Sequence, residues 1–259
     1  MILGHRVRFA STVLAMIAVV AVISARAAGA QPRFEWPDRA KNLKVLPKGT
    51  SKEQLSATMI GFTRALGVRC PFCHVGQEGQ PLTTFDFVSD QKPEKDIARG
   101  MVKMVRGVNH DLKKMKFEQG NQIEVQCITC HRGRPRPMSL TEELARVYEK
   151  AGIDSTVARY SMLRERFYGA GSYDFGERSL TDLGAAMMAK GRREDAIRIF
   201  QLNAQQNSSS SFAYSSLADA YAAAGQKDLA IQNYEKAIQL EPRNHEAEQK
   251  LRELRGESK

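Results

Sequence analysis

Apolar and polar residues follow a helical period over several long stretches of this chain. The first stretch begins at Ser51, with Gln54 at the spacing of a capping box, and reaches Leu66, where Gly67 can close a helix. We therefore expect a helix over this segment. Its apolar face contains Leu55, Met59, Phe62 and Leu66.

A second amphipathic helix is predicted from Pro93 to about Met115. Proline suits the first position of a helix because the N–H that it lacks is not needed there. Between the two helices, residues 76–91 are rich in Gly, Pro, Thr and Asp, which is typical of a loop. We expect the apolar faces of both helices to be buried. The second face contains Ile97, Met101, Met104, Val105, Val108, Leu112 and Met115.

The last part of the chain repeats with a period of 34 residues. Residues 211–244 have large and small residues at the offsets of a tetratricopeptide repeat, and residues 177–210 follow the same pattern except at Asn203 and Ser208. Small residues let paired helices approach, and large ones fill the space between them. The later copy matches at Tyr214, Leu217, Ala218, Tyr221, Gly225, Ala230, Tyr234, Ala237 and Pro242; the earlier copy matches at Leu180, Leu183, Gly184, Met187, Gly191, Ala196 and Phe200.

Two such repeats rarely bury enough surface alone, so more helices are expected beside them. A helical hairpin over residues 139–168 would start at Ser139, with Glu142 at capping-box spacing, and turn at Gly152. Residues 243–255 have the polar outer positions of a terminal capping helix. The expected fold class is therefore all-α: a small domain of helix–turn units, followed by a TPR-like array of helical hairpins.

The N-terminus has the pattern of a secretory signal peptide. Basic residues, among them Arg6 and Arg8, precede an apolar run over residues 9–25, and Ala28-Gly29-Ala30 follows as a cleavage site. We expect cleavage after Ala30 and a periplasmic protein. The alternative is an uncleaved single-span anchor, for which the run is slightly short.

Composition is that of a globular protein, with 42% hydrophobic and 26% charged residues. It excludes a disordered chain, a collagen and a polytopic membrane protein. The net charge of +10 is uneven: residues 31–138 contain 19 Lys and Arg against 11 Asp and Glu, whereas residues 139–259 contain 17 against 18. This change predicts a domain boundary between residues 138 and 139.

The basic surplus allows three interpretations. It can steer the protein to an acidic redox partner, neutralise the propionates of a haem, or be a solvated face. A nucleic-acid partner is not expected outside the cytoplasm. The candidates for propionate partners are Arg64, Arg69, Arg132 and Arg134.

All four cysteines lie in two copies of one motif, Cys70-Pro71-Phe72-Cys73-His74 and Cys127-Ile128-Thr129-Cys130-His131. C-x-x-C-H is the attachment signature of c-type haem. Two thiols one turn apart can form thioethers to the two vinyl groups of a porphyrin, and the adjacent histidine can then bind the iron. The sequence therefore predicts two covalently bound haem c groups, with His74 and His131 as proximal ligands.

Three other interpretations of the cysteines compete with haem attachment. The two pairs could bind one zinc ion, act as thioredoxin-like redox pairs, or form structural disulfides. A zinc site does not explain why a histidine follows both pairs, and redox pairs usually open a helix after a strand, whereas no alternation of strands and helices is visible here. The signal peptide also favours haem, because bacteria attach c-type haem outside the cytoplasm.

Iron in a c-type haem has a second axial position, and the helix before each motif contains candidates for it. A methionine at this position raises the potential, and an open position permits ligand chemistry. Spacing alone leaves Met59, Met101 and Met104 as candidates, although a methionine on an apolar face is more often core filler. His110 is a weaker candidate, and His245 is expected to be solvated.

Residues 42–137 resemble the cytochrome c subunit of photosynthetic reaction centres, and more closely its shorter dihaem relatives. In that family, each unit is a helix, a turn and C-x-x-C-H, and the helix supplies the distal methionine. The resemblance thus implies that Met59 faces the His74 haem and that Met101, rather than Met104, faces the His131 haem. Docking to a reaction centre is not implied, because the family's subunit has more haem sites than this chain. The matching stretches are residues 42–47, 59–64, 70–74, 85–87, 98–105 and 125–133.

The sequence therefore predicts a signal peptide over residues 1–30, a dihaem cytochrome domain over 31–138 and a TPR-like domain over 139–259. The expected function is single-electron transfer between protein redox partners, with a protein or peptide bound to the TPR-like surface. Two alternatives remain at this point. One is a dihaem peroxidase or reductase, and the other is a haem-containing protein-binding module.

Overall fold

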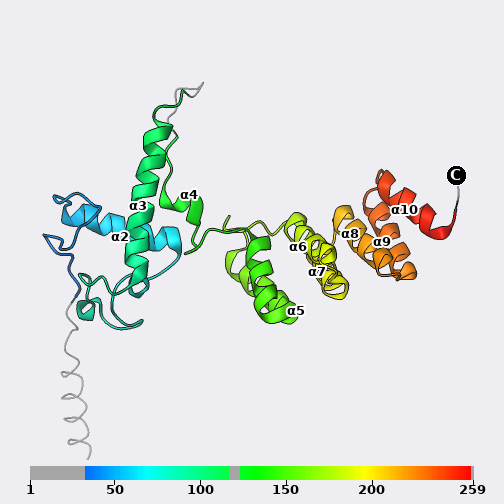
Figure 1. Cartoon of the computed structure of the whole chain (residues 1–259), viewed down its shortest axis with the longest axis horizontal. Helices are drawn as coiled ribbons and strands as arrows, with labels where there is room; N and C mark the ends of the chain where they lie inside the picture. The colour runs from blue at the N-terminus through cyan, green and yellow to red at the C-terminus, as the bar shows by residue number, and fades with distance from the viewer. Residues whose placement is uncertain (1–32, 117–122, 258–259) are drawn as a thin grey trace, which may run out of the picture. The chain divides into compact units, whose positions relative to one another are not determined.

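The computed structural model describes residues 33–116 and 123–257, which are helical and contain no β-strand (Figure 1). The predicted all-α fold class is confirmed. One isolated antiparallel bridge joins Val75 and Asp86 within the described part. The predicted signal peptide lies outside the described residues. None of the described helices combines the length and the apolar character that a membrane span requires.

The described residues form two compact units. The first unit contains residues 33–63, 69–116, 123 and 124, and the second contains residues 64–68 and 125–257. The first C-x-x-C-H motif lies in the first unit, and the second motif lies in the same unit as the repeats.

Helix α2 (Lys52–Leu66) starts and ends where the sequence predicts. The Ser51 backbone N–H donates to Gln54 Oε1 over 3.0 Å, and the Gln54 N–H donates to Ser51 Oγ over 3.3 Å, which completes the capping box. Gly67 closes the helix with φ 65°. Two short 3₁₀ turns follow, η1 (Cys70–Phe72) and η2 (Leu82–Thr84).

Helix α3 (Pro93–Leu112) has its predicted proline start but ends before Met115. The N–H of Met115 donates to the carbonyl of Leu112 over 3.1 Å, so the chain leaves the helix through a tighter turn.

No residue of α3 is buried, and the apolar residues Ile97, Met101 and Met104 are 60%, 40% and 53% exposed. The prediction that this face is buried is therefore wrong for the polypeptide by itself. The physical reason is a lack of apolar partners, because Leu55 is the one buried hydrophobic residue among the described residues of the first unit.

Polar bonds attach α3 to the rest of the first unit. The Asp90 carboxylate accepts hydrogen bonds from Asn42 Nδ2 over 2.9 Å, Lys44 Nζ over 2.6 Å and Arg99 Nη2 over 2.8 Å, and Lys95 Nζ lies 3.2 Å away. We call these five residues the Asp90 cluster. The cluster joins the segment before α2, the loop before α3 and the first turns of α3.

Helix α5 (Leu140–Phe167) contains both helices of the predicted hairpin. Ser139 and Glu142 form the predicted capping box, and Gly152 breaks the helix with φ 74° and ψ −173°. Only glycine adopts such a conformation at low cost. The hairpin prediction is confirmed.

The two predicted repeats are helix pairs, α6 (Glu177–Ala189) with α7 (Arg193–Gln206), and α8 (Ser211–Ala223) with α9 (Lys227–Leu240). Helix α10 (His245–Arg255) packs on α9 as the predicted capping helix, and consecutive helices lie side by side (Figure 1). The residues at the repeat offsets form the core of the second unit. Its buried members include Leu180, Leu183, Met187, Ala196, Phe200, Leu217, Ala218, Tyr221, Ala230, Tyr234 and Ala237.

Asn203, a departure from the repeat pattern, is fully buried. Its Nδ2 donates to the Glu177 carbonyl and to Thr181 Oγ1, both over 2.9 Å, and its Oδ1 accepts from Asn207 Nδ2 over 2.8 Å. A buried amide with these bonds avoids the cost of unpaired polar atoms and fastens α7 to α6.

Candidate haem-attachment sites

The first C-x-x-C-H motif forms a tight turn in the first unit. The backbone N–H groups of Cys73 and His74 both donate to the Cys70 carbonyl, over 3.2 Å and 3.0 Å. Both thiols are unpaired and half-buried. The turn therefore carries two thiols and one imidazole on five consecutive residues, as covalent attachment of a porphyrin requires.

A pair of phenylalanine rings lies beside the His74 imidazole. The ring of Phe87 lies 5.0 Å from it between centroids, and Phe85 stacks on Phe87 at 5.7 Å. Gly76 is required beside them, because a Cβ there would lie 2.5 Å from the Phe85 ring. The sequence reasoning assigned no role to these phenylalanines, although the Phe85-Asp86-Phe87 stretch was part of the resemblance.

The His74 imidazole is suited to binding iron as a neutral base. Burial lowers the pKa of His74, and the nearby positive charge of Lys95 lowers it further. The Nδ1 atom is buried and has no hydrogen-bond partner.

The second C-x-x-C-H motif is the short helix α4 (Cys127–His131) in the second unit. Its start is fixed by a capping box in which the Gln126 N–H donates to Thr129 Oγ1 over 3.0 Å. Both thiols are again unpaired, and that of Cys130 belongs to an exposed residue.

The residues after α4 hold the His131 ring. His131 Nδ1 donates to the Arg134 carbonyl over 2.8 Å, which leaves Nε2 with the lone pair that a metal needs. The chain turns back at Arg132, φ 48°, and at Gly133, φ 78°. The Gly133 N–H donates to the Ala65 carbonyl over 2.9 Å.

Cys73 and Cys127 do not have the electrostatics of reactive thiols. Burial raises the pKa of the Cys73 and Cys127 thiols, whereas a reactive C-x-x-C pair has a thiol of lowered pKa. In neither unit do three His, Cys, Asp or Glu side chains of the described residues gather as a possible metal site.

The candidate distal ligands lie on the two predicted helices. Met59 is half-buried on α2, in the same unit as His74, and Met101 is exposed on α3. Met101 and His131 belong to different units, so their pairing stays a prediction. His110 is exposed at the end of α3, and His245 is exposed beside Glu248 at 3.3 Å.

The residues present fit a c-type haem. Each motif offers two unpaired thiols and an adjacent histidine. In addition, α3 presents an exposed apolar side that includes Ile97 and Met101. Among the described residues of the same unit, Leu55 is the one buried hydrophobic residue. A flat apolar group against this side would supply the buried area that the polypeptide lacks.

Three of the four arginines suggested as propionate partners have structural contacts. Arg132 donates from Nε to the Thr129 carbonyl over 3.4 Å and from Nη1 to the Gly171 carbonyl over 3.5 Å. Arg69 Nε lies 2.8 Å from Glu78 Oε1. Arg134 is buried, with its guanidinium 4.2 Å from the centre of the Tyr173 ring and Nη1 donating to the Met138 carbonyl. Its Nε is buried without a partner, so Arg134 retains a donor for an acceptor oxygen.

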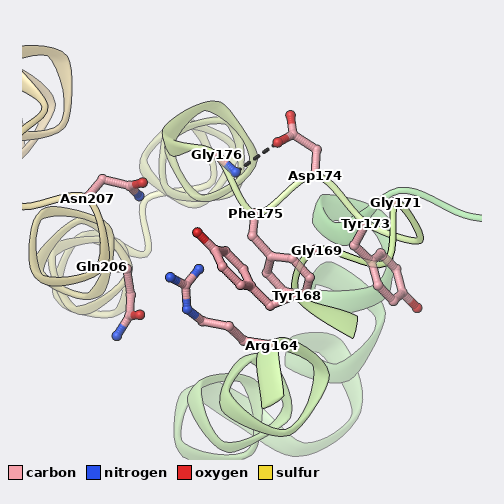
Figure 2. Close-up of a pocket in the computed structure, with 10 residues that line it drawn as sticks. All are labelled: Arg164, Tyr168, Gly169, Gly171, Tyr173, Asp174, Phe175, Gly176, Gln206 and Asn207. Atoms are coloured by element: carbon pink, nitrogen blue, oxygen red, sulfur yellow. Dashed lines mark hydrogen bonds between the residues drawn. The ribbon is translucent and has the colours of Figure 1, made fainter. Parts of the chain in front are cut away.

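A shallow groove of about 360 Å³ lies in the second unit, between the end of α5, the following loop and the end of α7. Figure 2 shows Arg164 and Tyr168 on one side and Gln206 and Asn207 on the other. The Arg164 guanidinium lies 4.1 Å from the centre of the Tyr168 ring. The groove thus combines a cation, an aromatic face and two side-chain amides.

Comparison with known sequences gives two family matches. The family described as photosynthetic reaction centre cytochrome C subunit matches residues 37–165, and the tetratricopeptide repeat matches residues 211–244. Cytochrome c-554 of Chloroflexus aurantiacus is 38% identical over 96 residues, which cover 36% of this chain and 20% of that protein. The photosynthetic reaction center cytochrome c subunit of Thermochromatium tepidum is 33% identical over 99 residues, which cover 38% of this chain and 21% of that protein. The chain thus spans about a fifth of the length of these curated relatives.

Solved structures with some likeness contain tetratricopeptide repeats. The first TPR domain of human RPAP3 is 23% identical, with a TM-score of 0.32 over 46% of this chain and 88% of that one. The first TPR of Spaghetti (RPAP3), bound to the HSP90 peptide SRMEEVD, is 23% identical, with a TM-score of 0.31 over 45% of this chain and 88% of that one.

The motifs, their surroundings and the family matches agree with the resemblance noted in the sequence. Covalently bound haem c is the cofactor that a cytochrome c family implies. Residues 37–165 of this chain belong to the photosynthetic reaction-centre cytochrome c subunit family, and residues 211–244 are a tetratricopeptide repeat.

Proposed function

We propose that this protein is a periplasmic dihaem c-type cytochrome that carries single electrons between protein redox partners. The proposal includes a signal peptide over residues 1–30, a dihaem domain over 31–138 and a TPR-like protein-binding domain over 139–259. The observation that carries it is the pair of C-x-x-C-H turns, each with unpaired thiols, in a chain that also exposes the apolar side of α3.

Each motif has a division of roles among its side chains. Cys70 and Cys73 hold one haem, and Cys127 and Cys130 hold the other. His74 and His131 are the proximal ligands, and haem iron, when bound, supplies a centre that takes up and releases one electron.

Met59 and Met101 are the proposed distal ligands. A methionine sulfur at each iron keeps small molecules from binding there and favours electron transfer over catalysis. The rest of the chain orients the two imidazoles, and burial lowers the pKa of His74, which favours its neutral form.

The mass of the intact protein tests this proposal. We expect the mature polypeptide plus two haems, with a mass that also places the N-terminus after Ala30. The double variants Cys70→Ser/Cys73→Ser and Cys127→Ser/Cys130→Ser should each retain one haem. A colourless protein with the mass of the bare polypeptide, produced in a host that matures c-type cytochromes, would contradict the proposal.

Spectra of the same material separate electron transfer from enzymatic chemistry. Two low-spin haems that do not bind carbon monoxide support an electron carrier. A high-spin component that binds carbon monoxide or cyanide would instead favour the dihaem peroxidase or reductase.

We further propose that the groove of Figure 2 contributes to binding a protein or peptide partner. It lies in the unit that contains the tetratricopeptide repeat, and Arg164 with Tyr168 offers a cation and an aromatic face together. Crosslinking in the native host should yield covalent products between this protein and its partner. These products should be lost in Tyr168→Ala but not in Met162→Ala, which changes an exposed residue outside the groove. Equal amounts of these products in both variants would contradict a role for the groove.

A further inference from the structure

The turn that follows α4 packs against a loop of the TPR-like part of the second unit. Ser172, between α5 and α6, donates its hydroxyl to the Arg132 carbonyl over 2.6 Å. The next residue, Tyr173, places its ring 4.2 Å from the Arg134 guanidinium. These contacts join residues about forty positions apart in the chain.

Two of the residues that make these contacts are buried. Ser172 is 6% exposed, and Arg134 is 8% exposed. Arg132 has a left-handed backbone, φ 48°, which is unfavourable for a residue with a Cβ. The hydroxyl of Ser172 binds the carbonyl of this residue and so holds the strained turn in place.

The held turn positions the proximal ligand. His131 Nδ1 donates to the carbonyl of Arg134, and the guanidinium of the same residue packs on the Tyr173 ring. A hydrogen bond to the Nδ1 proton fixes the orientation of the ring and makes Nε2 a stronger electron donor to a metal.

We propose that Ser172 and Tyr173 are positioning residues for the second haem: they hold the 132–134 turn, so the potential of the His131 haem depends on a loop of the TPR-like array. This inference rests on the proposed function, because it requires a haem at Cys127 and Cys130. It assigns an electronic role to a loop about forty residues after the motif in the chain.

The first motif provides an internal control. His74 Nδ1 is buried without a hydrogen-bond partner, and the first unit contains neither Ser172 nor Tyr173. Changes at these two residues should therefore leave the potential of the His74 haem unchanged.

Ser172→Val and Ser172→Thr test the hydroxyl with side chains of similar shape. In Ser172→Val the turn loses its bond, His131 donates less electron density to the iron, and the oxidised state is stabilised less. Potentiometry of the whole protein should thus show a more positive potential for one haem and no change for the other. Ser172→Thr should restore the value of the unchanged protein.

Tyr173→Leu and Tyr173→Phe test the ring in the same way. The leucine variant removes the aromatic face under Arg134 and should shift the same potential upward, whereas the phenylalanine variant keeps the face and should not. The shifted haem is identified by comparison with the two double cysteine variants described above.

Haem content and helicity separate the possible failures. If the unchanged protein lacks the second haem by mass, the proposed function fails. If two haems are present in every variant, with normal helical circular dichroism, and neither Ser172→Val nor Tyr173→Leu moves a potential, the inference is wrong. Equal shifts of both haems would also overturn it, because they indicate a general effect.

Discussion

At the scale of single residues, one glycine allows two segments of backbone to approach closely. Gly67, after α2, has φ 65°, and a Cβ there would lie 2.1 Å from the Gly133 carbonyl oxygen. The position brings the end of α2 against the turn after the second motif, where Gly133 donates to Ala65. Glycine is therefore required twice, for the backbone angle and for the space.

Gly67→Ala should separate these two requirements. We expect it to destabilise the second unit by about 1–3 kcal/mol more than Gly191→Ala, because overpacking adds to the cost of the positive φ. Gly191 is a matched control, with φ 74° and nothing within 4 Å of its Cβ position. The measurement is chemical unfolding, and equal losses in the two variants would show that the contact with Gly133 has no energetic importance.

The proposed distal ligands can be tested against a neighbour on the same face. Met101→Ala and Met59→Ala should each lower the potential of one haem and produce a high-spin component, because the sulfur ligand is lost. Met104→Ala should do neither, although Met104 is also exposed on α3. Visible spectra and potentiometry provide the comparison, and the assignment fails if Met104→Ala has the larger effect.

At the scale of elements, α3 is attached by charge rather than by a core. Its first turns contribute Lys95 and Arg99 to the Asp90 cluster, and no residue of the helix is buried. Hydrogen bonds from Arg99 and Lys44 hold the pKa of Asp90 well below its usual range. The stability contributed by the cluster therefore depends on an ionised Asp90.

The sign of the pH dependence follows from the lowered pKa. The contribution of Asp90 is fully present above the ordinary Asp pKa of about 3.9 and is lost as the pH falls toward the folded-state value. Asp90→Asn should thus lower the melting temperature at pH 7, and the difference from the unchanged protein should shrink below about pH 4.

The control for this prediction is Asp111→Asn. Asp111, near the end of α3, pairs with Lys114 just after the helix, and both side chains are more than 60% exposed, so little change is expected at any pH. A melting difference for Asp90→Asn that stays constant down to about pH 2.5 would refute the role of ionisation.

At the scale of the whole molecule, the two units differ in how their folds are stabilised. The second unit has a continuous apolar core from Leu140 to Leu251, whereas Leu55 is the one buried hydrophobic residue among the described residues of the first. Ordering a chain costs conformational entropy that a small apolar core cannot offset. We therefore expect the first unit to depend on a covalently attached haem for its order.

Production without haem attachment tests this dependence. Hydrogen exchange should show residues 52–63 and 69–112 losing protection in the haem-free protein, while α6–α9 keep theirs. The array serves as the internal control because its core needs no cofactor. Equal protection of α3 with and without haem would show that the Asp90 cluster suffices to order the first unit.

Local patterns in the sequence determined much of this structure. The capping boxes at Ser51 and Ser139, the break at Gly152 and the repeat offsets all act within a few residues, so they specify helices and hairpins before any long-range packing. The two C-x-x-C-H motifs are equally local, because their chemistry depends on five consecutive residues.

Tertiary structure alone decided how the sites are surrounded. Phe87 beside His74, Ser172 on the Arg132 carbonyl and Tyr173 on Arg134 are contacts across long stretches of chain, which no local period encodes. The exposure of the α3 face was missed for the same reason: an amphipathic pattern specifies which side of a helix is apolar, but burial depends on what the fold brings to that side.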